Sequence, residues 1–276
     1  MAWETRRARV KGVPLRWEES GEGLPVVFIH GIPTGPALWR DVIPKVEGAH
    51  CLVFEMVGYA ESIPEGRERD ISVSRQADYL LAWLDELGTE QAVFVGHDLG
   101  GGVAQIAAVR APQRCAGLVL TNSICYDSWP IPSVKALRSA SPLVRRLPDV
   151  LIKTMIASLL LRGHDDLRRA RESLAIHWRP YEQFDSASAM ARQVEALNVR
   201  DTLAIVDQLA TLDVPARVVW GAADAYQKVT YGHRLAGDLR TELRRIEGGK
   251  HFTPEDHPDA IAAATNEVVA DLRERD

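Results

Sequence analysis

The 276-residue sequence has few cysteines and no long hydrophobic run. Its three cysteines are Cys51, Cys115 and Cys125, and the first two lie in apolar, strand-like runs, which favours buried free thiols over a disulfide. The first residues lack the apolar core of a signal peptide. The most apolar stretch, residues 155–161, is far shorter than the roughly 20 residues that cross a bilayer. We therefore expect a cytoplasmic protein with no membrane partner.

The sequence also lacks an excess of basic residues. Lys and Arg number 33 against 38 Asp and Glu, a net charge of −5, which gives no electrostatic reason to expect a nucleic-acid partner. Hydrophobic residues make up 46% and charged residues 26%, values typical of globular domains. A small, largely apolar molecule is the expected partner.

Metal and cofactor motifs are missing as well. No Cys-x-x-Cys, Gly-x-Gly-x-x-Gly or Gly-Lys-Ser/Thr motif occurs. Five histidines show no metal-ligand spacing with one another: His50, His97, His164, His233 and His257. We expect no metal and no cofactor.

Short apolar runs alternate with segments of helical periodicity. The runs cover residues 26–29, 51–54, 92–95, 117–120 and 216–220. Each is apolar on both faces, which is typical of parallel strands covered by helices. Residues 74–87 carry apolar side chains at helical spacing and end before Gly88, a typical C-terminal cap. The pattern predicts an α/β fold with a mostly parallel sheet.

The alternation is interrupted once, between residues 123 and 212, where the pattern is helical. It resumes with the strand at 216–220, a run near 243–247 and a final helix over 258–274. We therefore expect an α/β core formed by residues 1–122 and 213–276. Residues 123–212 are expected to form a helical cap domain over the carboxyl ends of the strands.

A candidate nucleophile follows the third of these predicted strands. The segment Gly96-His97-Asp98-Leu99-Gly100 places an acid on a strand-to-helix turn, with glycines two residues before and two after it. This spacing is that of a nucleophile elbow with Asp in the usual position of Ser. The alternative is a glycine-rich helix start capped by Asp98.

Two further residues fall in loops after later strands. Asp224 follows the strand at 216–220, and His251 follows the last one, so the order along the chain is nucleophile, acid and base. Taken singly, Asp224 could be a turn or capping residue and His251 a solvated loop histidine. Together they predict a catalytic triad of Asp98, Asp224 and His251.

These motifs resemble the α/β-hydrolase superfamily over essentially the full chain, and in particular its Asp-nucleophile branch of epoxide hydrolases and haloalkane dehalogenases. The segment His30-Gly31-Ile32-Pro33 is similar to the oxyanion loop of that branch, and residues 251–259 resemble its catalytic-histidine segment. The resemblance implies an oxyanion hole formed by the backbone N–H groups of Ile32 and Leu99.

An Asp nucleophile restricts the reaction. A carboxylate that attacks an ester or amide forms a high-energy anhydride, whereas one that attacks an sp3 carbon forms an ordinary ester. Water activated by His251 can then hydrolyse that ester, with Asp224 orienting the imidazole. We expect a hydrolase with a covalent alkyl-enzyme ester.

The leaving group depends on the hydrogen-bond donors that face it. Haloalkane dehalogenases carry Trp after the nucleophile and often Asn after the His-Gly pair, where this chain has Leu99 and Ile32. Fluoroacetate-type enzymes carry Arg after the nucleophile, and Leu99 cannot bind a carboxylate as Arg does. The absence of these donors favours an epoxide hydrolase.

Epoxide opening needs a donor to the departing oxygen, and lid tyrosines supply it in the resembled family. The predicted cap offers Tyr126 and Tyr181, with His177 and Trp178 as substitutes. Each could instead anchor or pack the cap. Two alternatives to the epoxide hydrolase stay open: a haloalkane or haloacid dehalogenase with atypical halide donors, and a catalytically silent binding protein. A monomer and a homodimer are both compatible with the sequence.

Overall fold

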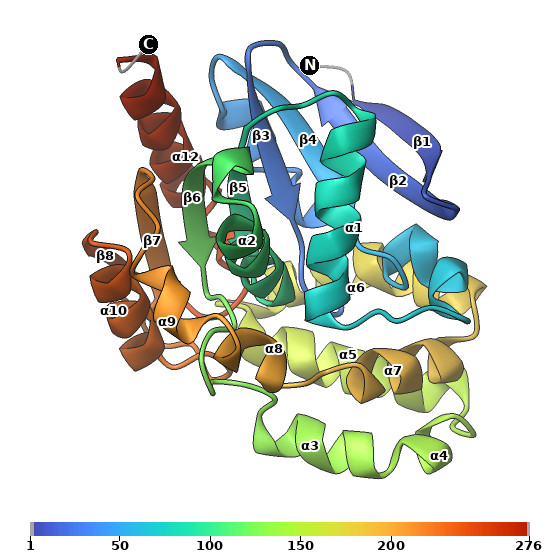
Figure 1. The fold of residues 1–276 in the computed structure, drawn as a ribbon. Coiled ribbons are helices and arrows are strands. Elements are labelled where there is room, and N and C mark those ends of the chain that lie inside the picture. Colours follow the sequence, from blue (N-terminus) through green and yellow to red (C-terminus); the bar gives the residue numbers. More distant parts are fainter. Residues whose placement is uncertain (1–2, 275–276) are drawn as a thin grey trace.

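The computed structural model describes residues 3–274 and has one eight-stranded sheet with helices on both faces (Figure 1). The strand order is β1-β2-β4-β3-β5-β6-β7-β8. Strand β2 is antiparallel to both of its neighbours, and every other neighbouring pair is parallel. The predicted mostly parallel α/β sheet is therefore confirmed. The strands are β1 (Glu4–Val10), β2 (Val13–Ser20), β3 (Leu24–Ile29), β4 (Ala49–Glu55), β5 (Ala92–His97), β6 (Cys115–Thr121), β7 (Ala216–Gly221) and β8 (Leu243–Ile246).

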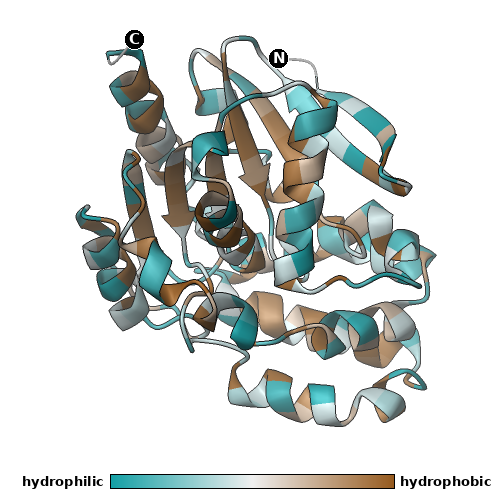
Figure 2. Ribbon diagram, viewed as in Figure 1, coloured by the Kyte–Doolittle hydropathy of each residue, from teal (hydrophilic) through white to brown (hydrophobic). Residues whose placement is uncertain are grey.

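The central strands are buried on both faces, which explains their continuous apolar sequence. Every residue of β5 is buried, and so are the last four residues of β3. Figure 2 shows the central strands largely in brown, the colour of hydrophobic residues. Strand β1 is different, because it lies at the sheet edge and most of its residues are exposed. The hairpin of β1 and β2 is the part of the sheet that the apolar runs did not indicate.

Five α-helices and four 3₁₀ helices of the described chain belong to the core. Helix α1 begins after Ser72, whose Oγ accepts a hydrogen bond from the Arg75 N–H, as an N-cap does. It ends before Gly88, which has a φ of 64° that suits glycine. The core helices are α1 (Val73–Glu86), α2 (Leu99–Arg110), α10 (Val229–Asp238), α11 (Thr253–Asp256), α12 (Pro258–Arg273), η1 (Pro36–Trp39), η2 (Ile43–Lys45), η3 (Ala60–Gly66) and η4 (Pro112–Arg114).

The segment between β6 and β7 is helical, as its sequence pattern indicates. We use the name helical insertion for residues 123–212. Figure 1 shows its helices below the carboxyl ends of the parallel strands, where the loops of the core converge. Its helices are α3 (Pro132–Ser139), α4 (Ser141–Val144), α5 (Asp149–Gly163), α6 (Leu167–Gln183), α7 (Ser186–Glu195), α8 (Arg200–Leu203) and α9 (Val206–Leu209).

Two properties expected from composition can be compared with the structure. Cys51, Cys115 and Cys125 are all buried and unpaired. Within residues 3–274, no helix combines the length and the apolar character needed to cross a membrane.

Candidate active site

Asp98 occupies a strained turn between β5 and α2. Its φ of 50° and ψ of −120° are unusual for a residue other than glycine. The glycines around it allow strand and helix to approach: a Cβ on Gly96 would lie 2.6 Å from the Gly100 carbonyl oxygen, and one on Gly100 would collide with the Ile29 carbonyl oxygen. This geometry is that of a nucleophile elbow, and it turns the Asp98 side chain toward the end of the sheet.

The structure brings the three predicted triad residues together. His251 Nδ1 lies 2.8 Å from Asp224 Oδ2, and His251 Nε2 lies 3.8 Å from Asp98 Oδ1. All three are buried, with exposed fractions of 6% for Asp98, 7% for Asp224 and 3% for His251. One imidazole nitrogen of His251 thus contacts the Asp224 carboxylate, while the other faces Asp98.

The second oxygen of Asp98 is held by the backbone. The Ile32 N–H donates a hydrogen bond of 3.0 Å to Asp98 Oδ2, and the Leu99 N–H at the start of α2 also favours the charged carboxylate. The loop before Ile32 must pass close to Asp98, because a Cβ on Gly31 would collide with the carboxylate. The two predicted donors of an oxyanion hole therefore act on the candidate nucleophile itself.

Burial raises the pKa of Asp98 above its usual value. The positive charge of His251 and the two backbone N–H groups act in the opposite direction. The carboxylate is therefore poorly solvated. Its Oδ1 faces His251 Nε2 at 3.8 Å, a longer distance than the 3.0 Å hydrogen bond on Oδ2.

Asp224 and His251 shift each other toward their charged forms. Burial opposes ionisation of Asp224, but the charge of His251 and hydrogen bonds from His251, Asn122 and the Tyr226 N–H outweigh it and lower the pKa of Asp224. Burial also opposes protonation of His251, yet Asp224, and more weakly Asp98, raise the pKa of the imidazole. Such coupled shifts are common at catalytic sites.

Asn122 is a site residue that the sequence patterns did not single out. Its Nδ2 donates to Asp224 Oδ2 at 2.6 Å, while its Oδ1 accepts from the Gly221 N–H at 3.0 Å and from Thr253 Oγ1 at 3.1 Å. The available signal was its place directly after the apolar strand β6, at the carboxyl edge of the sheet. Asn122 fixes the carboxylate that orients His251.

A cavity of about 60 Å³ opens beside Asp98. A single water needs roughly 10–15 Å³, so a small molecule fits. The walls combine residues of the core with residues of the helical insertion, and most of them are apolar. They are Ile32, Asp98, Leu99, Ile124, Trp129, Pro130, Ile131, Val134, Leu159, Leu197, Tyr226, Gln227 and His251.

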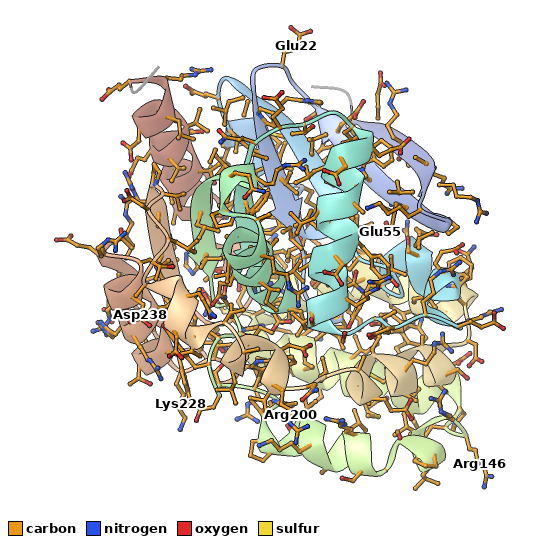
Figure 3. The ribbon with its side chains drawn as sticks, viewed as in Figure 1. Glu22, Glu55, Arg146, Arg200, Lys228 and Asp238 are labelled. Carbon is orange, nitrogen blue, oxygen red and sulfur yellow. The ribbon has the colours of Figure 1, made fainter. Side chains whose placement is uncertain are left out.

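The two predicted lid tyrosines do not line this cavity. Tyr126 OH donates to Asp238 Oδ2 at 2.5 Å, and Asp238 lies on α10 at the side of the core (Figure 3). Tyr181 OH donates to Gln193 Oε1 at 2.6 Å and is buried within the insertion. The expectation that they point into the cavity is wrong, because each hydroxyl donates its hydrogen bond to an acceptor outside the cavity.

The two substitute donors are directed elsewhere as well. His177 Nε2 lies 3.3 Å from Glu255 Oε1, and the Trp178 ring is stacked on Tyr181 at a centroid distance of 6.3 Å. Neither residue lines the cavity. His177 thus pairs with a carboxylate of the core, and Trp178 packs within the insertion.

No part of the described chain gathers three or more His, Cys, Asp or Glu residues in an arrangement that could hold a metal ion.

The geometry agrees with comparisons to known proteins. Residues 25–258 match the model of the alpha/beta hydrolase fold family, so the chain belongs to this family and is a hydrolase of that fold. It is 28% identical to haloalkane dehalogenase 2 of Mycobacterium tuberculosis over 266 residues, which cover 91% of this chain and 89% of the relative.

Solved structures share the fold. An alpha/beta hydrolase fold protein from Burkholderia ambifaria superimposes with a TM-score of 0.88 at 24% identity, covering 95% of this chain and 97% of the other. The epoxide hydrolase CorEH superimposes with a TM-score of 0.80 at 19% identity, covering 99% and 100% of the two chains. At these identities the likeness concerns the fold.

Proposed function

We propose that the protein is an epoxide hydrolase that forms a covalent ester on Asp98. The observation that carries the proposal is that the two carboxylate oxygens of Asp98 have different surroundings. Oδ2 is held by the Ile32 N–H at 3.0 Å, and Oδ1 faces His251 Nε2 at 3.8 Å. A substrate carbonyl cannot enter a donor pair that already holds Oδ2, which argues against acyl transfer.

The proposed reaction has two steps. In the first, Oδ1 of Asp98 attacks an sp3 carbon, the carbon–oxygen bond of the epoxide breaks, and an ester forms. In the second, His251 removes a proton from water, which attacks the ester carbonyl. The charge that develops on Oδ2 is stabilised by the N–H groups of Ile32 and Leu99, and Asp224 stabilises the imidazolium.

The chemistry of the cavity supports a small, largely apolar epoxide. The volume is about 60 Å³, and the walls beyond the triad are mostly aliphatic. Leu99 and Ile32 occupy the positions at which the resembled dehalogenases carry halide-binding side chains. A neutral three-membered ring needs no preformed anion site in the ground state.

A dehalogenase is the second candidate. It is favoured by the 28% identity to the haloalkane dehalogenase 2 of Mycobacterium tuberculosis. Both reactions pass through the same ester on Asp98, so the leaving group alone separates them.

The test isolates the covalent step in the variant His251→Phe. This variant is mixed with 1,2-epoxybutane, and intact-protein mass spectrometry measures the adduct. We expect one added epoxide mass, located by peptide mapping at Asp98, because the ester forms but cannot be hydrolysed. Asp98→Ala should give no adduct and no turnover. The exposed His233 provides a matched control, and His233→Phe should turn over without accumulating ester.

Three results would contradict the proposal. An unlabelled His251→Phe that still binds the epoxide would exclude the ester. Release of bromide from 1-bromobutane, together with no diol from 1,2-epoxybutane, would assign the protein to the dehalogenases. Tight binding of both compounds by the wild-type protein without turnover of either would identify a binding protein.

A further inference from the structure

Because neither Tyr126 nor Tyr181 lines the cavity, a donor to the departing oxygen must come from another polar side chain in its walls. Trp129 Nε1 donates to Thr202 Oγ1 at 2.7 Å. Tyr226 OH donates to the Leu159 carbonyl oxygen at 2.8 Å. Both donors are therefore committed to contacts within the protein.

Gln227 is the exception. It lines the same cavity as Asp98 and His251, and only 3% of the residue is exposed. Its Oε1 is buried without a hydrogen-bond partner in the described part of the chain. Among the cavity side chains outside the triad, its amide is the polar group that remains free to bind a ligand.

Hydrogen bonds fix the backbone around Gln227. The Trp220 indole N–H donates to the Gln227 carbonyl oxygen at 2.8 Å, and Trp220 is fully buried. Three residues earlier, Asp224 Oδ1 accepts the Tyr226 N–H at 2.7 Å. This turn therefore carries both the triad acid and the free amide, so the position of Gln227 is set together with that of Asp224.

An unpartnered buried amide destabilises a folded protein, since it has lost its water without gaining another partner. An apolar side chain of the same length would fill the wall of this mostly aliphatic cavity at a lower free energy. The buried atom without a partner is the amide oxygen, and a half-turn about the last side-chain bond exchanges it with the N–H donors. A ligand in the cavity can therefore pair with either end of the amide.

We propose that the Gln227 side-chain N–H binds the oxygen atom that leaves carbon when Asp98 attacks, which makes Gln227 a catalytic residue of the first step. This inference rests on the proposed epoxide hydrolysis. It assigns to the loop after β7 the task that lid tyrosines perform in the resembled family.

The amide donates a hydrogen bond and transfers no proton. The Asp98 Oδ1–carbon bond forms, the carbon–oxygen bond breaks, and its electron pair stays on the oxygen bound to Gln227. A water molecule protonates this alkoxide and becomes hydroxide. After a second water has hydrolysed the ester, the His251 imidazolium returns its proton to the hydroxide, so one water is consumed for each diol.

The test compares two leaving groups in the His251→Phe background, where only the first step is observed. Gln227→Met keeps the length of the side chain and removes the N–H donors. We expect alkylation of Asp98 by 1,2-epoxybutane to slow roughly 100-fold, the usual effect of losing one oxyanion donor. Alkylation by 1-iodobutane should change less than about threefold, because iodide is a weak hydrogen-bond acceptor.

Matched controls are Tyr126→Phe and Tyr181→Phe in the same background. Both hydroxyls lie outside the cavity, so each variant should be alkylated by the epoxide at the parent rate. The thermal midpoint of Gln227→Met should equal or exceed that of its parent, since the substitution removes an unpartnered buried amide.

Each other outcome has a defined meaning. An unchanged epoxide rate in Gln227→Met would overturn the inference. Equal slowing with both reagents, or a lowered thermal midpoint, would overturn it in favour of a structural role. Failure of the parent His251→Phe to be alkylated by either reagent would overturn the proposed function, and this inference with it.

Discussion

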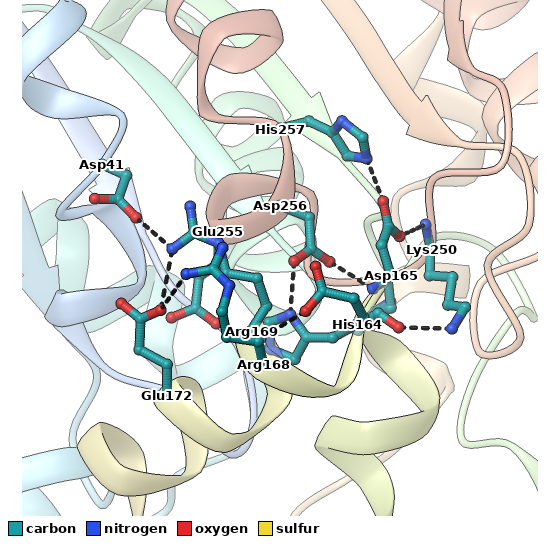
Figure 4. Close-up of polar contacts among 12 residues, drawn as sticks. Asp41, His164, Asp165, Arg168, Arg169, Glu172, Lys250, Glu255, Asp256 and His257 are labelled. Atoms are coloured by element: carbon teal, nitrogen blue, oxygen red, sulfur yellow. Dashed lines mark hydrogen bonds and ion pairs between the residues drawn. The ribbon is translucent and has the colours of Figure 1, made fainter.

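Two buried polar clusters contact Phe252, and each compensates a buried carboxylate in a different way. The Phe252 ring contacts His251, with centroids 5.0 Å apart, and it is stacked on His164 at 4.7 Å. The first cluster holds Asp98 and Asp224. The second surrounds Glu255 and is part of the contact network in Figure 4.

The Glu255 side chain is fully buried and is surrounded by basic side chains. Arg40 of the core pairs with it, His164 Nε2 lies 3.1 Å away and His177 Nε2 lies 3.3 Å away. Burial opposes its ionisation, but His164, His177 and Arg40 outweigh burial and hold the pKa of Glu255 well below its usual value. Because both histidines belong to the insertion, this carboxylate joins insertion to core.

Asp98 differs in that its charge is only partly compensated. One oxygen has a backbone donor at 3.0 Å, and the other is 3.8 Å from the nearest imidazole nitrogen. The pKa of Asp98 is accordingly raised, whereas that of Glu255 is lowered. The comparison teaches that a carboxylate surrounded by basic side chains suits a joint between parts of the fold, while one with weaker charge compensation suits a reaction.

The largest effect is expected at the acid of the first cluster. Asp224→Asn should lower kcat by about 10⁴, because the amide neither stabilises the imidazolium of His251 nor fixes its tautomer. Intact-protein mass spectrometry during turnover should show the ester on Asp98 accumulating. Turnover within about tenfold of the wild type would show that Asp224 does not orient the base.

Removing the negative charge of Glu255 should lower the stability of the fold and leave the reaction at Asp98 unchanged. Glu255→Gln should lower the free energy of unfolding by about 3–5 kcal/mol, because the bases around it remain buried without their partner. Urea denaturation measures this change. The control is Glu172→Gln, which loses a partly exposed partner of Arg40 and Arg169 and should change stability by less than about 0.5 kcal/mol. Equal losses of unfolding free energy in Glu255→Gln and Glu172→Gln would contradict a larger contribution from the buried carboxylate.

A smaller effect is expected at Asn122. The variant Asn122→Gly tolerates the φ of 42° at this position but loses the hydrogen bond to Asp224. Because a hydrogen bond to a charged group contributes about 1.5–3 kcal/mol, kcat should fall roughly 10- to 100-fold, with KM unchanged. Steady-state kinetics measures kcat and KM separately. An increase in KM alone would mean that Asn122 shapes the cavity and does not help to orient His251.

The smallest effect is expected from a change of pH. As the pH rises, the reaction at the first cluster should become faster, while the second cluster should contribute less to the free energy of unfolding. Burial opposes protonation of His164, but its hydrogen bonds to Asp256 and Glu255 raise its pKa from 6.5 to about 9. Its contribution to stability is therefore complete below pH 6.5 and is lost as the pH rises through about 9. The lowered pKa of Glu255 adds stability that is complete above pH 4.5 and is lost as the pH falls further.

Ester hydrolysis needs neutral His251, whose pKa is raised, so the rate should increase with pH through a midpoint above 6.5. Between about pH 7 and 9 the enzyme should thus become faster while the free energy of unfolding decreases. Urea denaturation and the rate of ester loss, followed over this range, check both trends. His164→Gln should reduce the loss of stability at high pH and move the midpoint of the rate profile slightly upward, because the charge of His164 lowers the pKa of His251. His233→Gln, on an exposed position of α10, should alter neither curve.

Much of the fold could be predicted because its signals are local. Strands β3 to β7 are apolar on both faces, and the glycines around Asp98 are required by the backbone contacts of a single turn. The positions of Asp98, Asp224 and His251 follow from the same rule, since each lies in the loop or turn that follows a strand. The hairpin of β1 and β2 escaped notice because its edge strand is mostly exposed and its sequence is charged.

The sequence by itself determined the central strands, the helical segment between β6 and β7, and the loops that carry reactive side chains, because these depend on neighbours a few residues apart. Only the tertiary structure decided which side chains enter the cavity. Tyr126 reaches Asp238, which is 112 residues away, and Asn122 reaches Asp224, which is 102 residues away. Side-chain direction depends on such distant partners, and each polar group turns toward the best acceptor or donor that packing places within reach.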